Sequence, residues 1–293
     1  MSLKSKIAFV ALVGALSGSV LAAPNAQKSP LGSGEVFVYA YPDGTRVHAF
    51  ETADPMQDSV LAIEIAKGLV GVESPAFTKD FQVWTNYLNG LEKPLNVVIF
   101  SNHPSAGLNA GEAWYGNTQT YASKNAQQAM QAGATKAIVD GLIPVYGKDF
   151  DASWAKITQT LPLGKSNIAS VTVDVQEDGA GNIIYFPELK AAYIHMLGAD
   201  THSILAGAQH CDQFIAQLQQ MKKSGVELIF SSHHAPEGAS ALDTKIAYVQ
   251  AVKNIAQNSA DKQSFIAAVK AKYPKLAGEQ YLEMTANAFY ATK

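Results

Sequence analysis

Two similar blocks of secondary-structure signals follow one another along the chain, and this repetition is the feature that most limits the fold. Each block contains short strands, then an amphipathic helix and a mostly apolar strand, and the two apolar strands are expected at residues 97–100 and 226–230. Mostly apolar strands are typical of a sheet that is covered on both faces. No linker-like stretch separates the blocks. The pattern therefore predicts a single α/β (α+β) domain, a four-layer αββα sandwich with two sheets face to face and helices outside.

The spacing of apolar residues predicts the other elements. Strands are expected at residues 35–39, 46–51, 59–65, 68–73, 168–175, 181–186 and 191–194. Helices are expected at residues 78–91, 123–133, 212–223, 243–257, 261–272 and 280–290. Residues 134–165 show no clear period, and the sequence predicts no single structure for them.

The first residues have the pattern of an export signal. Two lysines precede an uncharged, mostly apolar run over residues 7–21, and Ala22 provides the small residue of a cleavage site. This pattern predicts a secretory signal peptide over residues 1–22. The run is shorter than the roughly 20 residues that span a bilayer, so we expect a periplasmic or secreted protein with no membrane association after cleavage. Residues 23–34 are polar, with glycine and proline, and are expected to form a flexible N-terminal tail before a domain over residues 35–293.

Charge and cysteine content limit the partners. The chain has 22 Lys and Arg against 25 Asp and Glu, a formal net charge of −3. This balance argues against nucleic acid, whose phosphates require a basic stripe. Cys211 is the single cysteine, so no intramolecular disulfide can form and the core must stabilise the fold. A small-molecule substrate or ligand is the partner that we expect.

Five of the seven histidines lie at or just after the ends of predicted strands. They are His103, His195, His202, His233 and His234. Side chains at strand ends converge on binding sites, and imidazole is the commonest metal ligand. A single histidine is more often a hydrogen-bonded structural residue, but five in three short segments indicate a metal site.

Over residues 35–290 the chain resembles the metallo-β-lactamase superfamily. Residues 185–190 look like the strand before that family's metal-bridging aspartate, and Ser232-His233 matches the Gly-His of its final metal ligand. Both segments also look like the alkylsulfatase branch, while residues 243–290 look like the C-terminal helices of esterase and lactonase members. The resemblance implies the αββα fold, zinc as the cofactor and hydrolysis of small molecules.

The first metal-binding box departs from the family pattern His-x-His-x-Asp-His. When His103 is aligned with its first histidine, Ser105 replaces the second histidine, Gly107 the aspartate and Leu108 the third histidine. The bridging aspartate is also replaced, with His195 at or next to its position. The resemblance therefore does not extend to the usual dinuclear zinc site.

Two interpretations of the function follow, and the sequence leaves open whether the protein is an enzyme. In the first, the histidines named above rebuild a site for one zinc, whose bound water attacks small esters, lactones, amides or sulfate esters. Asp200 or Glu177 would orient a ligand or act as a base. In the second, the fold is retained without its chemistry, and the protein is an inactive binding or accessory protein.

Overall fold

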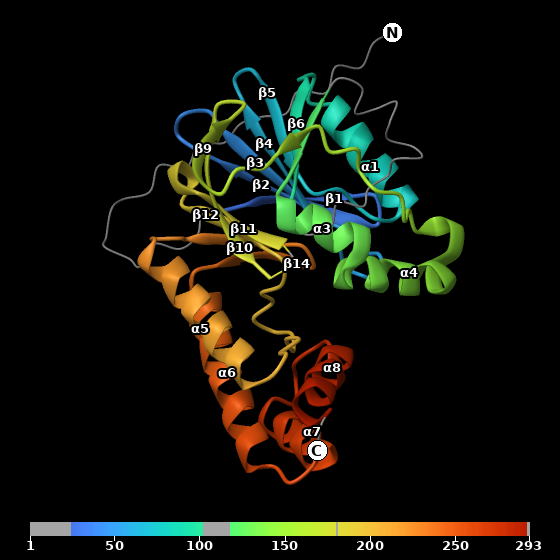
Figure 1. The fold of residues 1–293 in the computed structure, drawn as a ribbon. Helices are drawn as coiled ribbons and strands as arrows, with labels where there is room; N and C mark the ends of the chain where they lie inside the picture. Colours follow the sequence, from blue (N-terminus) through green and yellow to red (C-terminus); the bar gives the residue numbers. More distant parts are fainter. Residues whose placement is uncertain (1–24, 102–117, 180, 292–293) are drawn as a thin grey trace.

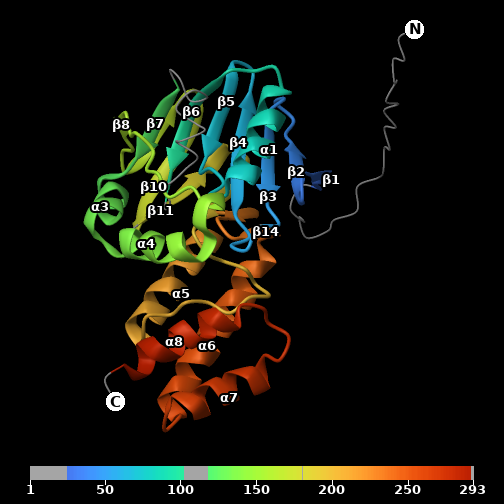
Figure 2. The ribbon, with the colours of Figure 1, turned by 90° about the vertical axis from the view of Figure 1, so that its right-hand side faces the viewer.

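The structure is a computed structural model that describes residues 25–101, 118–179 and 181–291. The predicted signal peptide and His103 lie outside these residues. Two sheets form the centre of the molecule, one with eight strands and one with six. Figures 1 and 2 show the two sheets stacked at one end and a group of helices, α5 to α8, at the other.

The eight-stranded sheet follows the order of the chain. Its strands are β1 (Gln27–Leu31), β2 (Gly34–Ala40), β3 (Arg46–Glu51), β4 (Ser59–Ile65), β5 (Gly68–Val72), β6 (Leu95–Phe100), β7 (Gln119–Ala122) and β8 (Gln159–Thr160). The first five strands form an antiparallel meander, and β5 to β8 are parallel to one another. The carboxyl ends of β5 and β6 therefore lie at the same edge of the sheet.

The six-stranded sheet has the order β14-β13-β12-β11-β10-β9. Its strands are β9 (Gly164–Ile168), β10 (Val171–Asp178), β11 (Gly181–Phe186), β12 (Ala191–Ile194), β13 (Leu228–Ser231) and β14 (His234–Gly238). All neighbours are antiparallel except β12 and β13, which are parallel. This parallel pair is the part of the sheet that leads into the candidate site.

Helices complete the outer layers. They are α1 (Thr78–Asn89), α3 (Lys124–Ala132), α4 (Ala134–Tyr146), α5 (Ala208–Lys223), α6 (Ser240–Asn258), α7 (Lys262–Lys272) and α8 (Glu279–Tyr290). Helix α1 covers the first sheet, whereas α5 and α6 pack on the outer face of the second. Figures 1 and 2 show α3 and α4 at the end of the sandwich, between the sheets and the C-terminal helices. The predicted four-layer αββα sandwich is confirmed.

Alternation along the strands explains the layers. In β12, Tyr193 is buried between the two sheets, while Ala192 and Ile194 face the helices. In β3 and β4 the same alternation places Phe50 and Ala62 under α1, where Phe50 stacks on Trp84 at 5.6 Å between ring centroids. Because successive strand residues point to opposite faces, strands with two apolar faces must lie in the interior. One apolar core therefore forms where both sheets meet, and a second forms between the six-stranded sheet and helices α5 to α8.

The prediction of a flexible N-terminal tail over residues 23–34 is wrong at residues 27–31. Gln27–Leu31 forms β1, which pairs antiparallel with β2 at the edge of the first sheet. Its side chains are almost all exposed, so the polar sequence carries no apolar alternation from which a strand could be predicted. Backbone hydrogen bonds hold this strand, and Pro30 is tolerated because an edge strand needs to donate on one side only.

An ionic network lies beneath the end of α1. The buried Glu64 accepts two hydrogen bonds from Arg46, at 2.6 and 2.7 Å, and pairs with Lys93 at 2.9 Å. His48 Nε2 lies 3.0 Å from the same carboxylate, and His48 Nδ1 lies 2.7 Å from the Tyr87 hydroxyl. Burial opposes ionisation of Glu64, but these hydrogen bonds outweigh it and lower its pKa to about 2. The network ties β3 and β4 to α1.

Candidate functional site

The candidate site lies where β12 and β13 end. These strands are parallel neighbours in which Ile194 pairs with Ser231, so the residues that follow leave the sheet at the same edge. His195 follows β12 directly, and His233 follows β13 by two residues. Their imidazole rings are neighbours, with 5.3 Å between centroids and an angle of 59° between the ring planes. The structure therefore brings together two of the histidines that the sequence singled out.

The connection between β3 and β4 lies against His233. His233 Nδ1 is 3.1 Å from the Met56 carbonyl oxygen and 3.3 Å from Asp58 Oδ1. The other carboxylate oxygen of Asp58 accepts a hydrogen bond of 2.9 Å from the Ala76 backbone N–H. Asp58 is 7% exposed, so these partners replace water. Nothing in the sequence marks Asp58 as a site residue, because it follows no strand and belongs to no motif.

Tyr193 lies beneath the histidine pair and joins the two sheets. Its hydroxyl is 3.1 Å from both the Ser59 carbonyl oxygen and Ser232 Oγ. Burial raises the pKa of the Tyr193 phenol well above its ordinary value, and the charges of Glu73 and Asp58 add to this effect. Tyr193 therefore stays neutral and acts as a hydrogen-bond donor between β4 and the segment that carries His233.

The first sheet reaches the same edge through β5 and β6. Glu73 follows β5, and its side chain is buried. Its backbone is in the left-handed region, with φ of 59°. Its Oε1 accepts a hydrogen bond of 2.9 Å from the Ser101 backbone N–H, directly after β6. Ser101 Oγ in turn donates to the Asn182 carbonyl oxygen at 2.7 Å, at the start of β11. Glu73 is a second polar residue of this edge that the sequence reasoning missed.

Burial controls the protonation of His195. Burial, with a smaller contribution from the neighbouring His233, lowers its pKa to about 3. The imidazole of His195 is therefore neutral at physiological pH. A neutral imidazole has a lone pair on one nitrogen and can bind a metal ion or accept a hydrogen bond.

His202 occupies a different place. It is 2% exposed, and its Nδ1 lies 2.9 Å from the hydroxyl of Tyr248 on α6. The neighbouring Thr201 carbonyl oxygen accepts a hydrogen bond of 2.6 Å from the buried Lys245, whose pKa burial lowers to about 8. His202 is thus part of a polar network that attaches the segment after β12 to the C-terminal helices.

His234 and Asp200 pair with each other rather than with His195. His234 Nε2 is 2.8 Å from Asp200 Oδ1, and its Nδ1 is 3.5 Å from Glu237 Oε2. Glu237 also accepts hydrogen bonds from the backbone N–H groups of Gly198 and Ala199, at 3.0 and 2.7 Å. Burial opposes protonation of His234, but Glu237, the Ala235 carbonyl and Asp200 outweigh it and raise its pKa. These contacts attach the segment after β12 to β14.

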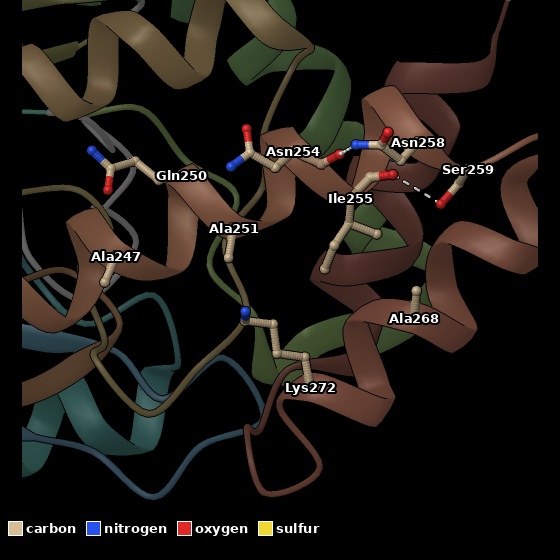
Figure 3. A pocket seen from close by; sticks show the side chains of 9 residues that line it. All are labelled: Ala247, Gln250, Ala251, Asn254, Ile255, Asn258, Ser259, Ala268 and Lys272. Carbon is tan, nitrogen blue, oxygen red and sulfur yellow. Dashed lines mark hydrogen bonds between the residues drawn. The ribbon is translucent and has the colours of Figure 1, made fainter.

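Glu177 and a groove between α6 and α7 lie apart from the histidine pair. Glu177 is exposed on β10, and β11 separates that strand from β12. A groove of about 530 Å³ runs between α6 and α7 and is lined mostly by alanine and amide side chains, with Lys272 at its rim (Figure 3). Because none of the predicted site residues lines it, we do not assign this groove as the active site.

Comparison with known proteins separates fold from function. No protein-family model matches the chain, and no curated protein matches it. Among solved structures, a sec-alkylsulfatase from Pseudomonas sp. superposes with a TM-score of 0.63 and 14% identity over 86% of this chain and 49% of its own. A metallo-β-lactamase family protein from Thermus thermophilus superposes with a TM-score of 0.57 and 11% identity over 84% of this chain and 91% of its own.

A metallo-β-lactamase from Erythrobacter litoralis superposes with a TM-score of 0.50 and 13% identity, over 77% of this chain and all of its own. The chain has the metallo-β-lactamase fold. This confirms the resemblance inferred from residues 185–190 and Ser232-His233. At these identities the similarity shows the fold alone. The chain also spans only about half the length of the alkylsulfatase that it matches.

The metallo-β-lactamase fold implies zinc, and the residues at this edge fit zinc in part. His195 and His233 supply two imidazoles, and Asp58 stands behind His233 as carboxylates commonly do behind zinc-bound histidines. A catalytic zinc needs three protein ligands. Across residues 25–101, 118–179 and 181–291, however, no group of three or more His, Cys, Asp or Glu side chains could hold a metal ion. The prediction that His103 is a ligand concerns a residue outside these ranges.

The part of the chain that the structure describes contains no helix with the length and apolarity that crossing a bilayer requires.

Proposed function

We propose that this protein is a metal-dependent hydrolase of small molecules, with His195 and His233 as two ligands of one zinc. The observation that carries the proposal is the pair itself, with ring centroids 5.3 Å apart at the ends of adjacent parallel strands. His195 is held neutral by burial, which is the form that binds a metal. A bound zinc would lower the pKa of its water to about 7 and polarise a substrate oxygen.

The surroundings of the pair favour substrates with an apolar part. Next to His233, the Met56 side chain packs against a cluster that includes Phe77, Tyr146 and Trp154. Small esters, lactones, amides and sulfate esters can combine an apolar group with a polarised oxygen. The sec-alkylsulfatase of the same fold supports the inclusion of sulfate esters. Of the predicted acid–base residues, Asp200 pairs with His234, so we assign it to positioning the segment after β12 and not to proton transfer.

A second candidate is an inactive binding or accessory protein with this fold. The replacements at Ser105, Gly107 and Leu108 favour it, as does the lack of a three-ligand group among the described residues. The two functions differ in metal content and turnover, which can be measured on one preparation.

Zinc content and hydrolysis will decide between these functions. We expect the protein, purified without chelator, to contain close to one zinc per chain and to hydrolyse at least one ester, lactone, amide or sulfate ester of a test panel. His233→Ala should lose the zinc and at least about 100-fold in kcat/KM, because a metal site fails without a ligand. His210→Ala is the matched control, since His210 stacks on Phe214 in α5, away from the pair, and should retain both. Less than a tenth of an equivalent of metal and no turnover would establish the inactive function.

We also propose that the protein is exported to the periplasm or secreted and acts there on a small molecule without binding nucleic acid or membrane. The positive charges before the apolar run at residues 7–21 support this proposal. Cell fractionation followed by N-terminal sequencing should find a mature form that begins at Ala23. Recovery of the full-length chain in the cytoplasm would contradict export.

A further inference from the structure

We propose that Asp58 is a positioning residue that keeps a proton on Nδ1 of His233, so that Nε2 carries the lone pair that binds the metal. The role of Nε2 rests on the proposed function, whereas the position of the proton is a property of this chain alone. Asp58 would act through His233 and would not touch the substrate.

Two oxygen atoms lie close to Nδ1 of His233. Nδ1 has hydrogen-bond geometry to the Met56 carbonyl oxygen at 3.1 Å and lies within ion-pair distance of Asp58 Oδ1, at 3.3 Å; neither oxygen can donate a hydrogen bond. A nitrogen that faces two acceptors is stabilised only when it carries the hydrogen. The His233 and Asp58 side chains are 9% and 10% exposed, so water competes little for these contacts. The partner of one imidazole nitrogen determines the tautomer and hence the role of the other.

The local structure explains why both acceptors reach the same nitrogen. The connection between β3 and β4 is closed at its base by a hydrogen bond of 2.8 Å from the Thr52 backbone N–H to the Asp58 carbonyl oxygen. Within it, Asp54 Oδ1 accepts a hydrogen bond of 2.7 Å from the Met56 backbone N–H. Gln57 lies between the two acceptors in the left-handed backbone region, with φ of 53°. This turn allows the carbonyl of Met56 and the side chain of Asp58 to point in one direction.

The Asp58 carboxylate is itself held in place. Its Oδ2 accepts a hydrogen bond of 2.9 Å from the Ala76 backbone N–H, which leaves Oδ1 directed at His233. Ala76 follows β5 closely, so the contact links His233 of the second sheet to the edge of the first. A carboxylate behind a metal-binding histidine fixes the ring orientation and raises its basicity, and loss of such a residue typically weakens metal binding about 10- to 100-fold.

The test is the tautomer of His233, measured without metal. In the full chain labelled with ¹⁵N-histidine, long-range ¹H–¹⁵N correlation spectra distinguish an Nδ1–H from an Nε2–H imidazole, and His233→Gln assigns the signal. We expect the Nδ1–H pattern in the native chain. Asp58→Asn, whose amide can donate to the ring, should reduce the Nδ1–H population and weaken zinc binding about 10- to 100-fold in a chelator competition.

Asp80→Asn is the matched control for lost charge. Asp80 is a buried carboxylate of α1, and one of its oxygens has no hydrogen-bond partner among the residues that the structure describes. Burial raises its pKa, and the charge of Asp58 acts in the same direction. This variant should leave the His233 tautomer unchanged. An Nε2–H pattern in the native chain would overturn the inference without any variant, and so would an unchanged pattern in folded Asp58→Asn. If the native chain binds no zinc but shows the Nδ1–H pattern, the proposed function fails while the assignment of the proton stands.

Discussion

Glu64→Gln is expected to destabilise the protein by about 2–3 kcal/mol, because the buried His48 and the partly exposed Arg46 and Lys93 lose the carboxylate that they share. The Glu64 side chain is 3% exposed and accepts from Arg46, Lys93 and His48. A glutamine side chain has no charge, and its NH₂ group would point toward the cationic side chains of Arg46 or Lys93. Chemical denaturation of the variant and the native chain at pH 7 measures the difference in the free energy of unfolding.

Glu35→Gln provides the control. Glu35 also lies on a strand of the first sheet and pairs with Lys28, but both side chains are more than two-fifths exposed, so this change should remain within about 0.5 kcal/mol. The pKa of Glu64 gives a second check. Since it is lowered to about 2, the stabilisation is complete above the ordinary glutamate pKa and is lost as pH falls through 2. A Glu64→Gln effect below 1 kcal/mol, or one that grows as the pH falls, would contradict the assigned network.

Tyr193→Ala is expected to cost about 3–5 kcal/mol of stability, the range for removing a large aromatic side chain from a close-packed core. Tyr193 is fully buried between the sheets, and its hydroxyl connects the start of β4 to Ser232. Tyr193→Phe isolates the hydroxyl and should cost about 1–3 kcal/mol, since the buried Ser59 carbonyl oxygen and Ser232 hydroxyl lose the partner that joins them. Thermal and chemical unfolding of both variants measure these differences.

Tyr121→Phe is the control for the hydroxyl. The Tyr121 hydroxyl bonds only locally, to Gln119, in an exposed position, so its removal should change stability by less than about 0.5 kcal/mol. If Tyr193→Phe also changes the free energy of unfolding by less than about 0.5 kcal/mol, the hydroxyl does not hold the two sheets together at the candidate site.

Most elements of the fold could be predicted because their signals are local. The apolar period over residues 212–223 and 261–272 gave helices that agree with α5 and α7 to within a few residues. Strand β14 was missed because its five residues are all half-buried and include Pro236, so they neither alternate nor form an apolar run. Residues 134–165, for which the sequence predicts no single structure, contain α4 and the two-residue strand β8.

The candidate site could be predicted only in part. Sequence analysis placed His195 and His233 after apolar strands, and the structure brings them together. It could not separate them from His202 and His234, which follow strands equally closely. What distinguishes these two is the partner of each ring, a tyrosine of α6 for His202 and two carboxylates for His234. These partners are brought to each ring by tertiary packing, and no periodic pattern of the sequence predicts them.

The sequence by itself determined the layered fold and the ends of its strands, because the alternation of apolar side chains is read within a few residues of each position. Only the tertiary structure decided that β12 and β13 run side by side, and that a carbonyl 177 positions earlier in the chain meets a ring nitrogen of His233. The physical reason is that strand pairing and the contact between the sheets depend on surfaces assembled from distant segments. The energy of each such contact depends on burial, which no short stretch of sequence specifies.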